Sequence, residues 1–538
     1  MTNRLYYGDN LGILREHIAA ESVDLVYLDP PFNSNATYNV LFRSPEGKES
    51  PAQIEAFDDT WHWGENAENA YWEVLHGAST DAARMLEAMR GFLGENDMMA
   101  YLAMMAARLI ELHRVLKKTG SLYLHCDPTA SHYLKILLDA IFGLDKYRAE
   151  IIWKRTNARG TDKNWPHIHD IIFHYGDASG VFKSQKAKAD VAKTPHTLIT
   201  GVDGQKYQTY ELTGPGVTKE GDSGKPWRGF DPSKFGRHWA NSTEQREEWN
   251  AAGLIHFPAK DGFPRRRDEF PFDPLGRMVT VGDVWVDIDR INQTAKERLG
   301  YPTQKPVALL ERIISASSNE GDVVLDPFCG CGTTVHAAQK LKRQWIGIDV
   351  THLAIGLIER RLRDAFGKEA QFETVGVPQD VGAARALADK DKHEFQKWAI
   401  SLIPDAQPFR GGKKGADTGI DGIIYLKTGK TKTDKAIVEV KGGAVSVDQI
   451  HKLKSVIDRE KALAGIFVTL NPPTKPMEKE AAAAGFAETD YGRIPRLQIL
   501  TIDDILTFKK TPRLPVVDSS AFRKAKREEK VDQGKFDL

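Results

Sequence analysis

The 538-residue chain contains little cysteine, and its three cysteines are Cys126, Cys329 and Cys331. Three are too few for a disulfide framework, so the composition favours a reducing compartment, and we expect the cytoplasm. The sequence shows no signal-peptide pattern and no apolar run of about 18 residues, so we expect no membrane partner. These absences exclude the disulfide-rich secreted class and the membrane-spanning class.

Net charge is also absent, because Lys and Arg total 74 and Asp and Glu total 74. A neutral balance does not exclude a DNA partner, since DNA binding needs a basic face and not a basic whole. Cys329 and Cys331 lack a second pair of metal ligands nearby, so we interpret them as small loop residues. The length predicts about three to four domains.

A buried strand followed by an acid and two prolines is the first stretch of chemical interest. The apolar run 23–28 predicts the strand, and Asp29–Phe32 ends it because proline cannot donate to a ladder. Ligands of open α/β sheets bind at this carboxyl edge. Taken alone, the tetrapeptide is equally compatible with an ordinary strand-ending turn.

The stretch suits chemistry on an aromatic amino group, which is a poor nucleophile because its lone pair is delocalised into the ring. The Asp29 carboxylate and the Pro30 carbonyl can accept its two N–H bonds and favour a tetrahedral nitrogen. Pro30 and Pro31 stiffen that carbonyl, and Phe32 can stack on a base taken out of the duplex.

A second stretch has the pattern of a nucleotide-type loop. Residues 323–334 predict a strand and a small-residue turn, and a helix follows from Val335 to Leu341. The next strand, 345–349, ends in Asp349, which can accept both hydroxyls of a ribose. The loop lacks the glycine spacing of a dinucleotide fingerprint and has no phosphate-binding lysine.

LDPPF followed by DPFCGCGTT resembles the DNA amino-methyltransferases that use S-adenosylmethionine, the N6-adenine/N4-cytosine family. The catalytic motif precedes the cofactor motif, as in their beta class. The resemblance covers about the first two-thirds of the chain. It implies a circularly permuted Rossmann-like α/β fold with a seven-stranded doubly wound sheet, S-adenosylmethionine as cofactor and double-stranded DNA as partner. A homodimer remains open.

The resemblance also assigns residues. It implies catalytic roles for Asp29, Pro30, Pro31 and Phe32. It implies cofactor binding by Asp9, Asp29, Thr303, Lys305, Asp326, Phe328, Gly330, Gly332, Thr333, Thr334 and Asp349. A helix N-cap is the alternative, and compatible, role of Asp9. His125 and Asp127 could form an acid–base pair, although polar residues at strand ends are more often structural.

The order of elements predicts a methyltransferase first half at 1–175 and a second half at 286–375. Between them, 176–285 has no clear periodicity and interleaves Arg and Lys with Trp, for example at 225–229 and 237–239. Such a surface suits contact with phosphates and bases, so we expect a target-recognition insert. A solvated insertion is the alternative.

The C-terminal third has a second constellation of charged residues. Asp421 precedes the strand 423–426, and Glu439 and Lys441 share one face of the strand 436–441. Two carboxylates can hold Mg²⁺, with Asp421 and Glu439 as ligands. Lys441 can then orient the attacking water in metal-assisted phosphodiester hydrolysis.

This arrangement resembles the PD-(D/E)xK nucleases, and among them the Mrr-like restriction group, with Glu394 before and Gln449 after the core residues. Ile420 departs from the pattern, since proline is common there. We expect an Mrr-like α/β nuclease domain at 386–510 and a charged tail at 511–538. An inert domain that only binds DNA is the alternative.

The sequence therefore predicts a restriction–modification fusion that methylates adenine N6. N4-cytosine shares the geometry and stays open, as do RNA and protein amides as minority targets. C5-cytosine chemistry needs a cysteine nucleophile, typically after proline, and no Pro-Cys occurs. A non-catalytic DNA-binding subunit is a further alternative, which the intact Asp29–Phe32 stretch argues against.

Overall fold

The computed structural model places most of the chain. It describes residues 2–31, 37–43, 49–58, 62–77, 79–158, 165–188, 198–201, 203–218, 221–258, 262–271, 278–292, 295, 297–299, 301, 303–409, 419–429 and 432–515, with 37–43 and 49–58 as backbone only. The chain divides into a compact unit of 184–281 and a second unit formed by the rest, and each is described by itself. None of the described helices is long and apolar enough to cross a membrane.

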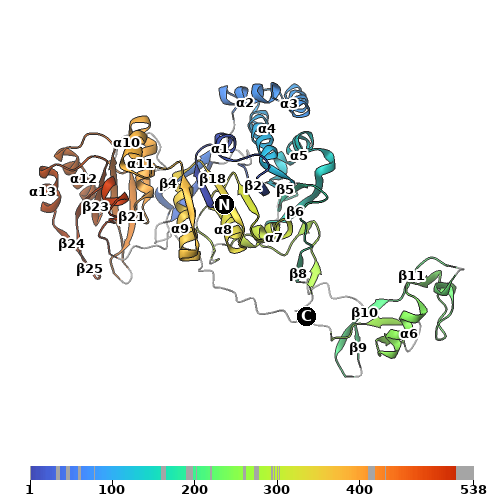
Figure 1. Cartoon of the computed structure of the whole chain (residues 1–538). Coiled ribbons are helices and arrows are strands. Elements are labelled where there is room, and N and C mark those ends of the chain that lie inside the picture. Colours follow the sequence, from blue (N-terminus) through green and yellow to red (C-terminus); the bar gives the residue numbers. More distant parts are fainter. Residues whose placement is uncertain are drawn as a thin grey trace. The chain divides into compact units, whose positions relative to one another are not determined.

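A nine-stranded mixed sheet organises the larger unit within the described residues (Figure 1). Its spatial order is β16 (Val284–Trp285), β6 (Tyr147–Lys154), β7 (His169–Gly176), β5 (Leu116–Cys126), β2 (Val23–Leu28), β17 (Val323–Asp326), β18 (Gln344–Asp349), β1 (Asn3–Tyr7) and β19 (Phe372–Val375). Only β7 runs antiparallel to both its neighbours. The expected count of seven strands was wrong, because β16 adds to β6 and β19 adds to β1 at the two edges.

Helices cover both faces of this sheet. Tyr6 of β1 packs in one hydrophobic cluster with α1 (Asn10–His17), α4 (Asp97–Val115) and α5 (Pro128–Phe142). Its neighbour Leu5 lies near Val335 of α8 (Thr333–Lys340), beside Gly347 of β18. Successive strand residues point to opposite faces, so α8 lies on the face opposite α1. Further helices of this unit are α2 (Glu65–Leu75), α3 (Thr80–Leu93), α7 (Val307–Ser317) and α9 (His352–Phe366).

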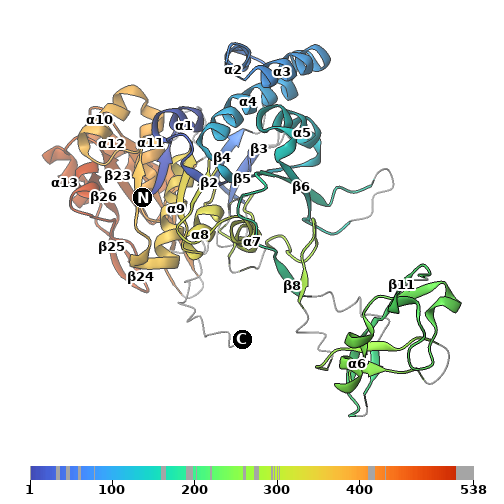
Figure 2. The same ribbon diagram turned by 45° about the vertical axis from the view of Figure 1, so that its right-hand side comes forward.

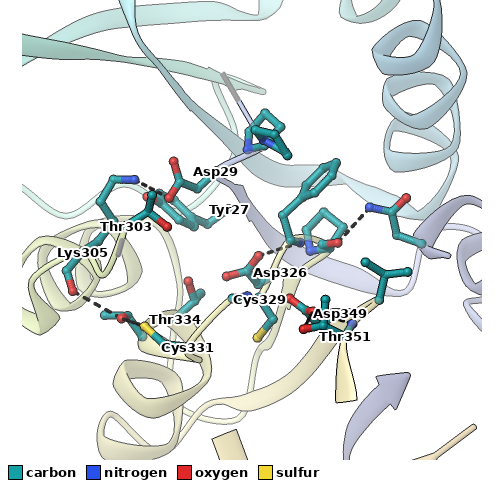
Figure 3. Close-up of a pocket in the computed structure, with 18 of the residues that line it drawn as sticks. Tyr27, Asp29, Thr303, Lys305, Asp326, Cys329, Cys331, Thr334, Asp349 and Thr351 are labelled. Carbon is teal, nitrogen blue, oxygen red and sulfur yellow. Dashed lines mark hydrogen bonds and ion pairs between the residues drawn. The ribbon is translucent and has the colours of Figure 1, made fainter. Parts of the chain in front are cut away.

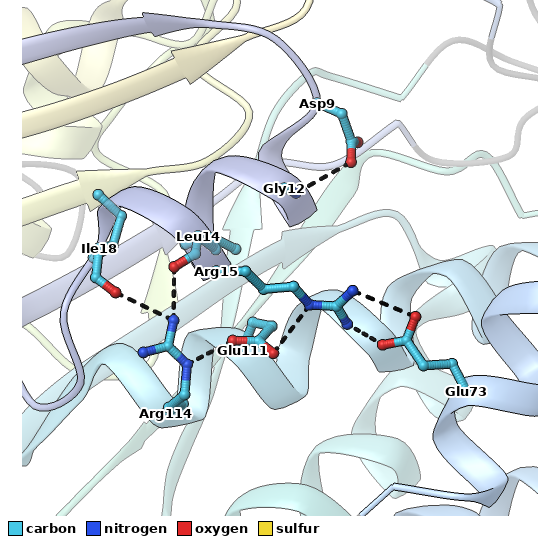
Figure 4. A network of polar contacts seen from close by, with 8 residues as sticks. All are labelled: Asp9, Gly12, Leu14, Arg15, Ile18, Glu73, Glu111 and Arg114. Atoms are coloured by element: carbon cyan, nitrogen blue, oxygen red, sulfur yellow. Dashed lines mark hydrogen bonds and ion pairs between the residues drawn. The ribbon is translucent and has the colours of Figure 1, made fainter.

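Ionic contacts hold α1 against its neighbours (Figure 4). Arg15 of α1 pairs with Glu73 of α2 and with Glu111 of α4, the latter at 3.2 Å. Arg114 donates to Glu111 at 2.6 Å and to the carbonyl of Leu14 at 2.6 Å. Asp9 caps α1 by accepting a hydrogen bond from the Gly12 amide at 3.4 Å, which fixes the turn between β1 and α1.

The unit 184–281 contains a small sheet in the order β13 (Ile255–His256), β14 (Arg265–Arg267), β10 (Lys206–Glu211) and β9 (Leu198–Thr200). It also contains the pairs β11 (Thr213–Pro215) with β12 (Arg237–Trp239) and β8 (Lys186–Lys188) with β15 (Met278–Thr280), and the helix α6 (Thr243–Ala251). Figure 2 shows this unit in green.

Trp227 and Trp239 do not form the exposed surface that the sequence predicted, because they are 5% and 1% exposed and build the core of this unit. Arg246 is buried between them, with its guanidinium 5.5 Å and 4.7 Å from the two rings. The neighbouring Arg228 pairs with Glu247 at 2.6 Å. A small domain without a large apolar core uses these aromatic and cationic groups for its own packing.

The C-terminal part of the larger unit has a five-stranded sheet. The order is β20 (Gln407–Pro408), β21 (Gly422–Lys427), β22 (Thr433–Lys441), β23 (Ala464–Thr469) and β26 (Leu497–Thr501). Its other elements are α10 (Val381–Lys390), α11 (Lys392–Ser401), α12 (Val447–Arg459), α13 (Lys475–Ala483), α14 (Ile502–Leu506) and the hairpin β24 (Phe486–Thr489) to β25 (Gly492–Pro495). The predicted order of helix, strand, strand, helix and strand is confirmed. A further strand pair, β3 (Thr37–Arg43) with β4 (Glu49–Asp58), follows β2.

Candidate active site

Three acids meet at the carboxyl edge of the large sheet. Asp29 follows β2, Asp326 ends β17 and Asp349 ends β18, and these strands are parallel neighbours with β17 in the middle. They line one cavity of about 270 Å³ (Figure 3). The cavity is lined by Gly8, Asp9, Asn10, Tyr27, Asp29, Pro30, Pro31, Arg108, Tyr301, Thr303, Lys305, Leu310, Asp326, Pro327, Phe328, Cys329, Gly330, Cys331, Thr333, Thr334, Asp349, Val350 and Thr351.

The structure thus brings together nearly every cofactor and catalytic residue assigned from the first two motifs. Gly332 does not line the cavity, but it is the N-cap of α8, with a φ of 73° and Ile358 at 2.7 Å from where a Cβ would stand. Glycine is therefore required there to close the turn into the helix. Phe32 lies outside the described residues.

Asp29 has two oxygens in different situations. Its Oδ2 pairs with the ammonium of Lys305, which comes from the segment before α7. Its Oδ1 is buried and has no hydrogen-bond partner among the described residues. A buried acceptor without a partner costs free energy, so it marks the place for a donor from a ligand.

Hydrogen bonds fix the loop after β17 to the end of β18. The Gly330 amide donates to Asp349 Oδ2 at 2.9 Å, and the Thr351 amide donates to Oδ1 at 2.9 Å. The Phe328 amide donates to Asp326 Oδ1 at 3.0 Å. Gly330 has a φ of 52°, a backbone conformation that favours glycine.

Burial dominates the ionisation of the two loop acids. It raises the pKa of Asp326 to about 7 and that of Asp349 to about 6, although hydrogen bonds to both groups oppose the shift. A cavity with carboxyls held near their own pKa favours a ligand that carries positive charge, because such a ligand stabilises the ionised form.

Arg108 and Asn10 were missed by the sequence analysis. Arg108 reaches from α4 to donate to Asp9 Oδ1 at 2.7 Å and to Asn10 Oδ1 at 2.6 Å. Asn10 in turn donates to the Pro327 carbonyl at 2.9 Å. These hydrogen bonds join the turn after β1 to the loop after β17. No local pattern in the sequence signals a contact over 98 residues.

Two buried cysteines lie in the loop after β17, and an arginine contacts this loop. Cys329 and Cys331 are both buried, and Arg361 of α9 donates to the Cys331 carbonyl at 2.9 Å and to Thr333 Oγ1 at 3.1 Å. Burial raises the pKa of both thiols. The described residues contain no cluster of three or more potential metal ligands.

His125 and Asp127 do not form a pair. Asp127 caps α5 by accepting from the Thr129 amide at 3.0 Å, as expected for an acid before a Pro-led helix. The Nε2 atom of His125 lies 3.2 Å from Asp170 Oδ2 on β7. The partner of His125 is thus set by the pairing of β5 with β7 and not by closeness in the sequence.

The C-terminal triad is brought together at one end of β21 and β22. Gly422 pairs with Val438, which places Asp421 opposite Glu439 in the antiparallel register. Asp421 Oδ2 accepts from the Val440 amide at 2.7 Å, and Lys441 pairs with Glu439 Oε1 at 3.0 Å. Glu439 is buried and Lys441 is partly exposed.

The two flanking residues of the nuclease pattern, Glu394 and Gln449, each make a contact of their own. Glu394 of α11 accepts a hydrogen bond from Tyr7 Oη at 3.0 Å, so it contacts β1 of the large sheet. Gln449 belongs to a capping box at the start of α12, where its side chain accepts from the Ser446 amide at 3.0 Å. Glu394 thus contacts β1 and Gln449 caps α12, and a part for either residue in the second site stays a prediction.

Comparison with known proteins identifies the family. A family model described as DNA methylase (N6_N4_Mtase) matches residues 23–360, and the chain belongs to this family. A second model, described as NACHT-associated inactive Restriction Endonuclease 1, matches residues 407–507. The assignment of that region to the Mrr-like group is not supported by this match.

Individual relatives are distant. The type II methyltransferase M.EcaI of Enterobacter cloacae is 26% identical over 75% of this chain and 79% of its own length. The DNA adenine methyltransferase YhdJ of Escherichia coli K12 is 26% identical over 66% of this chain and 82% of its own. A solved DNA modification methylase of Thermus thermophilus, complexed with S-adenosyl-L-methionine, is 17% identical, covering 69% of this chain and 99% of that one with a TM-score of 0.31.

Proposed function

We propose that this DNA methylase transfers a methyl group from S-adenosylmethionine to N6 of adenine in double-stranded DNA. The observation that carries the proposal is the Asp29 carboxylate. One of its oxygens is held by Lys305, and the other is buried without a hydrogen-bond partner among the described residues. That oxygen and the Pro30 carbonyl can accept the two N–H bonds of an amino group.

The cavity fits the charge of S-adenosylmethionine. Among the described residues, four carboxyls line it, Asp9, Asp29, Asp326 and Asp349, against two cations, Arg108 and Lys305. S-adenosylmethionine carries a sulfonium, an ammonium and a carboxylate, so a net acidic cavity is complementary to it. When bound, it supplies an electrophilic methyl group on sulfur.

Each part of the cofactor has a candidate partner in this chain. Asp349 can accept from the ribose hydroxyls, and Thr303 and Lys305 can hold the methionine carboxylate. The family resemblance assigns Asp9 to the adenine of the cofactor, and the Arg108 guanidinium donates a hydrogen bond to its carboxylate. The remaining candidates come from the loop after β17: Asp326, Phe328, Gly330, Thr333 and Thr334.

Adenine is favoured over cytosine on two grounds. The catalytic stretch begins with Asp29, and in the family Asp leans to adenine and Ser to cytosine. YhdJ, which is described as an adenine methyltransferase, matches 66% of this chain. Neither ground depends on which DNA sequence the enzyme recognises.

Target recognition is proposed for the insert between the two methyltransferase halves. The compact unit 184–281 keeps basic side chains on β14, where Arg265, Arg266 and Arg267 are partly exposed. Arg266 and Arg267 each lie over an aromatic ring, at 4.8 Å from the Trp249 centroid and 4.4 Å from the Tyr207 centroid. Partly exposed arginines that lie over aromatic rings suit contacts with phosphates and bases.

Nucleoside analysis tests the proposal. Duplex DNA of random sequence is incubated with the full chain and S-adenosylmethionine, digested to nucleosides and analysed by mass spectrometry. We expect N6-methyladenine, and none from Asp29→Ala, while calorimetry shows that this variant still binds the cofactor. N4-methylcytosine as the sole product would overturn the adenine assignment, and no methylated base would overturn the function.

A second function is proposed for the C-terminal domain, namely Mg²⁺-dependent hydrolysis of DNA. The observation that favours it is that Asp421, Glu439 and Lys441 lie together at one end of β21 and β22. Asp421 and Glu439 are oxygen donors of the kind that Mg²⁺ prefers, and Lys441 would orient water. The match to a family described as inactive weighs against cleavage, in which case the domain binds DNA without cutting it.

A further inference from the structure

The ammonium group of Lys305 lies against the Asp29 carboxylate and not beside the acids of the cofactor loop. Nζ of Lys305 pairs with Asp29 Oδ2, and the two side chains are only 12% and 16% exposed. In Figure 3 they point toward each other, with Asp349 on the other side of the cavity. The pair joins two parts of the chain that are 276 positions apart, because Asp29 follows β2 and Lys305 comes from the segment before α7.

The backbone on which Lys305 stands is held from both sides. The Thr333 hydroxyl donates to the Lys305 carbonyl at 3.3 Å. The preceding residue, Gln304, donates to the Glu297 carbonyl at 2.6 Å. The following residue, Pro306, is the N-cap of α7 and has a φ fixed by its ring. The lysine side chain therefore starts from a fixed point when it reaches toward the carboxylate.

The charge of this ammonium also acts on Asp170 of β7. Burial would raise the pKa of Asp170, but its hydrogen bond with His125 and nearby positive charges, including that of Lys305, bring the pKa below its ordinary value. In the order of the sheet, β7 lies on one side of β2, and β17 and β18 lie on the other. The ammonium is thus on the side away from the strands that carry Asp326 and Asp349.

A largely buried lysine is costly unless its charge has a partner. Ordering the long side chain costs conformational entropy, and burying the ammonium costs hydration. The partner in this structure is Asp29. A methionine carboxylate would have to share the ammonium with an anion that is already in place. The contact with Asp29 is therefore the interaction that the geometry supports most directly.

Holding one oxygen of Asp29 also fixes the direction of the other. A carboxylate turns easily about its Cβ–Cγ bond, so a single anchored oxygen restricts the whole group. The anchored oxygen is Oδ2, and Oδ1 is buried with no hydrogen-bond partner among the described residues. An amino group placed there would meet an acceptor of fixed direction, and fixed geometry of the reacting groups contributes much of an enzyme's rate.

We propose that Lys305 is a positioning residue whose ammonium holds Asp29 Oδ2 and keeps Oδ1 directed at the amino group of the target base. The inference rests on the proposed methyl transfer at Asp29. It differs from the cofactor contact that the family resemblance implies for Lys305. A positioning role predicts a defect in methyl transfer by the loaded enzyme, whereas a cofactor contact predicts a defect in affinity.

The decisive variant is Lys305→Met, which keeps an unbranched side chain and removes the charge. We expect kcat, measured at saturating S-adenosylmethionine on random-sequence duplex DNA, to fall roughly tenfold or more. The dissociation constant for S-adenosylmethionine in calorimetry should stay within about threefold of the wild type, which also shows that the cavity is folded. A kcat within about threefold of the wild type, with cofactor affinity lowered or not, would overturn the inference.

Lys340→Met is the matched control. Lys340 is the last residue of α8 and pairs with Glu311 of α7 at 2.8 Å, so this variant also removes a lysine ion pair that involves α7 or its approach. It does not touch Asp29, and its kcat should equal that of the wild type. A loss as large as that of Lys305→Met would mean that any weakening around α7 slows the enzyme, and the role assigned to Lys305 would fall.

Chemical rescue separates the ammonium from the packing of the lysine stem. In Lys305→Cys treated with 2-bromoethylamine, the thiolate displaces bromide, and sulfur replaces one methylene of a lysine side chain. We expect kcat to recover to within about threefold of wild type treated in the same way, whereas iodoacetamide, which adds a neutral amide, should restore nothing. The native cysteines are buried among the described residues, which favours reaction at position 305.

Recovery with neither reagent, or equally with both, would overturn the inference, because the proposed role needs a positive charge at the end of this side chain. Failure of the proposed function has a different signature. A wild type that binds S-adenosylmethionine but methylates no DNA would refute the methyl transfer itself. An active wild type with an equally active Lys305→Met would refute only the role of Lys305.

Discussion

The Tyr7 hydroxyl donates a hydrogen bond of 3.0 Å to Glu394, a residue 387 positions further along the chain. Tyr7 stacks on His352, with the ring centroids 3.8 Å apart, and His352 Nε2 lies 3.9 Å from the same Glu394 oxygen. Tyr7 directly precedes Gly8 and Asp9 of the cavity, and His352 directly follows Thr351. The helix α11 therefore contacts two residues that directly adjoin the lining of the cavity.

The first prediction is that Glu394→Ala weakens cofactor binding although Glu394 does not line the cavity. Glu394 is partly exposed, so the loss should be near the low end for a hydrogen bond to a charged group, about 1 kcal/mol. The dissociation constant for S-adenosylmethionine would rise roughly fivefold in calorimetry. Glu373→Ala is the control, since its ion pair with Arg4 on β1 is exposed. Equal affinity in wild type and Glu394→Ala would show that α11 is not coupled to the cavity.

The second prediction is that cofactor binding releases protons at pH 7. Burial raises the pKa of Asp326 to about 7, so about half of these carboxyls carry a proton in the empty cavity. A positively charged ligand lowers that pKa and expels the proton. The observed binding enthalpy should then differ between phosphate and Tris buffers. Asp326→Asn should lose most of this difference, and identical enthalpies for the wild type in both buffers would contradict the prediction.

The third prediction concerns acid stability. His174 stacks on Tyr123 at 4.2 Å, and burial, assisted by the charge of Arg148, lowers its pKa from 6.5 to about 4. The unfolded chain therefore binds this proton more readily, so the stability that His174 contributes is present above pH 6.5 and is lost as the pH falls towards 4. Between pH 7 and pH 5 the loss is about 2 kcal/mol.

His174→Phe should remove that part of the pH dependence. Denaturant unfolding gives the free energy of unfolding of wild type and variant at pH 7 and at pH 5. The pH-dependent change in the variant is subtracted from that in the wild type. The opposing titration of the buried cavity acids is common to both proteins and cancels. His132→Gln is the control, because His132 is exposed on α5. An unchanged pH dependence in His174→Phe would mean that the ring is already solvated.

The acids of the cavity were predictable because strand periodicity and turn residues are local signals. Asp29, Asp326 and Asp349 each end an apolar strand, and parallel strands bring their carboxyl ends to one edge. Arg108 and Asn10 were missed, since the hydrogen bond between them joins positions 98 residues apart. Contacts at that separation depend on strand order, which periodicity does not reveal.

The insert and Glu394 are cases in which a local pattern predicted contacts that the fold does not make. Trp227, Trp239 and Arg246 have the composition of a DNA-contacting surface, yet they pack on each other. Composition does not tell a small aromatic core from an exposed patch. Glu394 sits on the helix that the nuclease pattern calls for, but its carboxylate contacts the other domain. Its helix was predictable, and the direction of its side chain was not.

The last prediction is that the C-terminal domain cuts DNA with Mg²⁺ and that Lys441→Ala abolishes cutting while methylation persists. The ammonium of Lys441 lies 3.0 Å from Glu439 Oε1, where it can orient water beside a metal held by Asp421 and Glu439. Asp29 lies on a different sheet, so methyl transfer should not respond.

Plasmid DNA, methylated and unmethylated in parallel, is incubated with the full chain, Mg²⁺ or Mn²⁺, and with or without S-adenosylmethionine. Lys435→Ala is the matched control, because Lys435 lies on the same strand and pairs with Glu460 at 3.0 Å, away from the triad. It should cut like the wild type. If the wild type cuts neither plasmid under any of these conditions, the nuclease proposal is wrong. Asp421, Glu439 and Lys441 would then be present without activating a water molecule for hydrolysis.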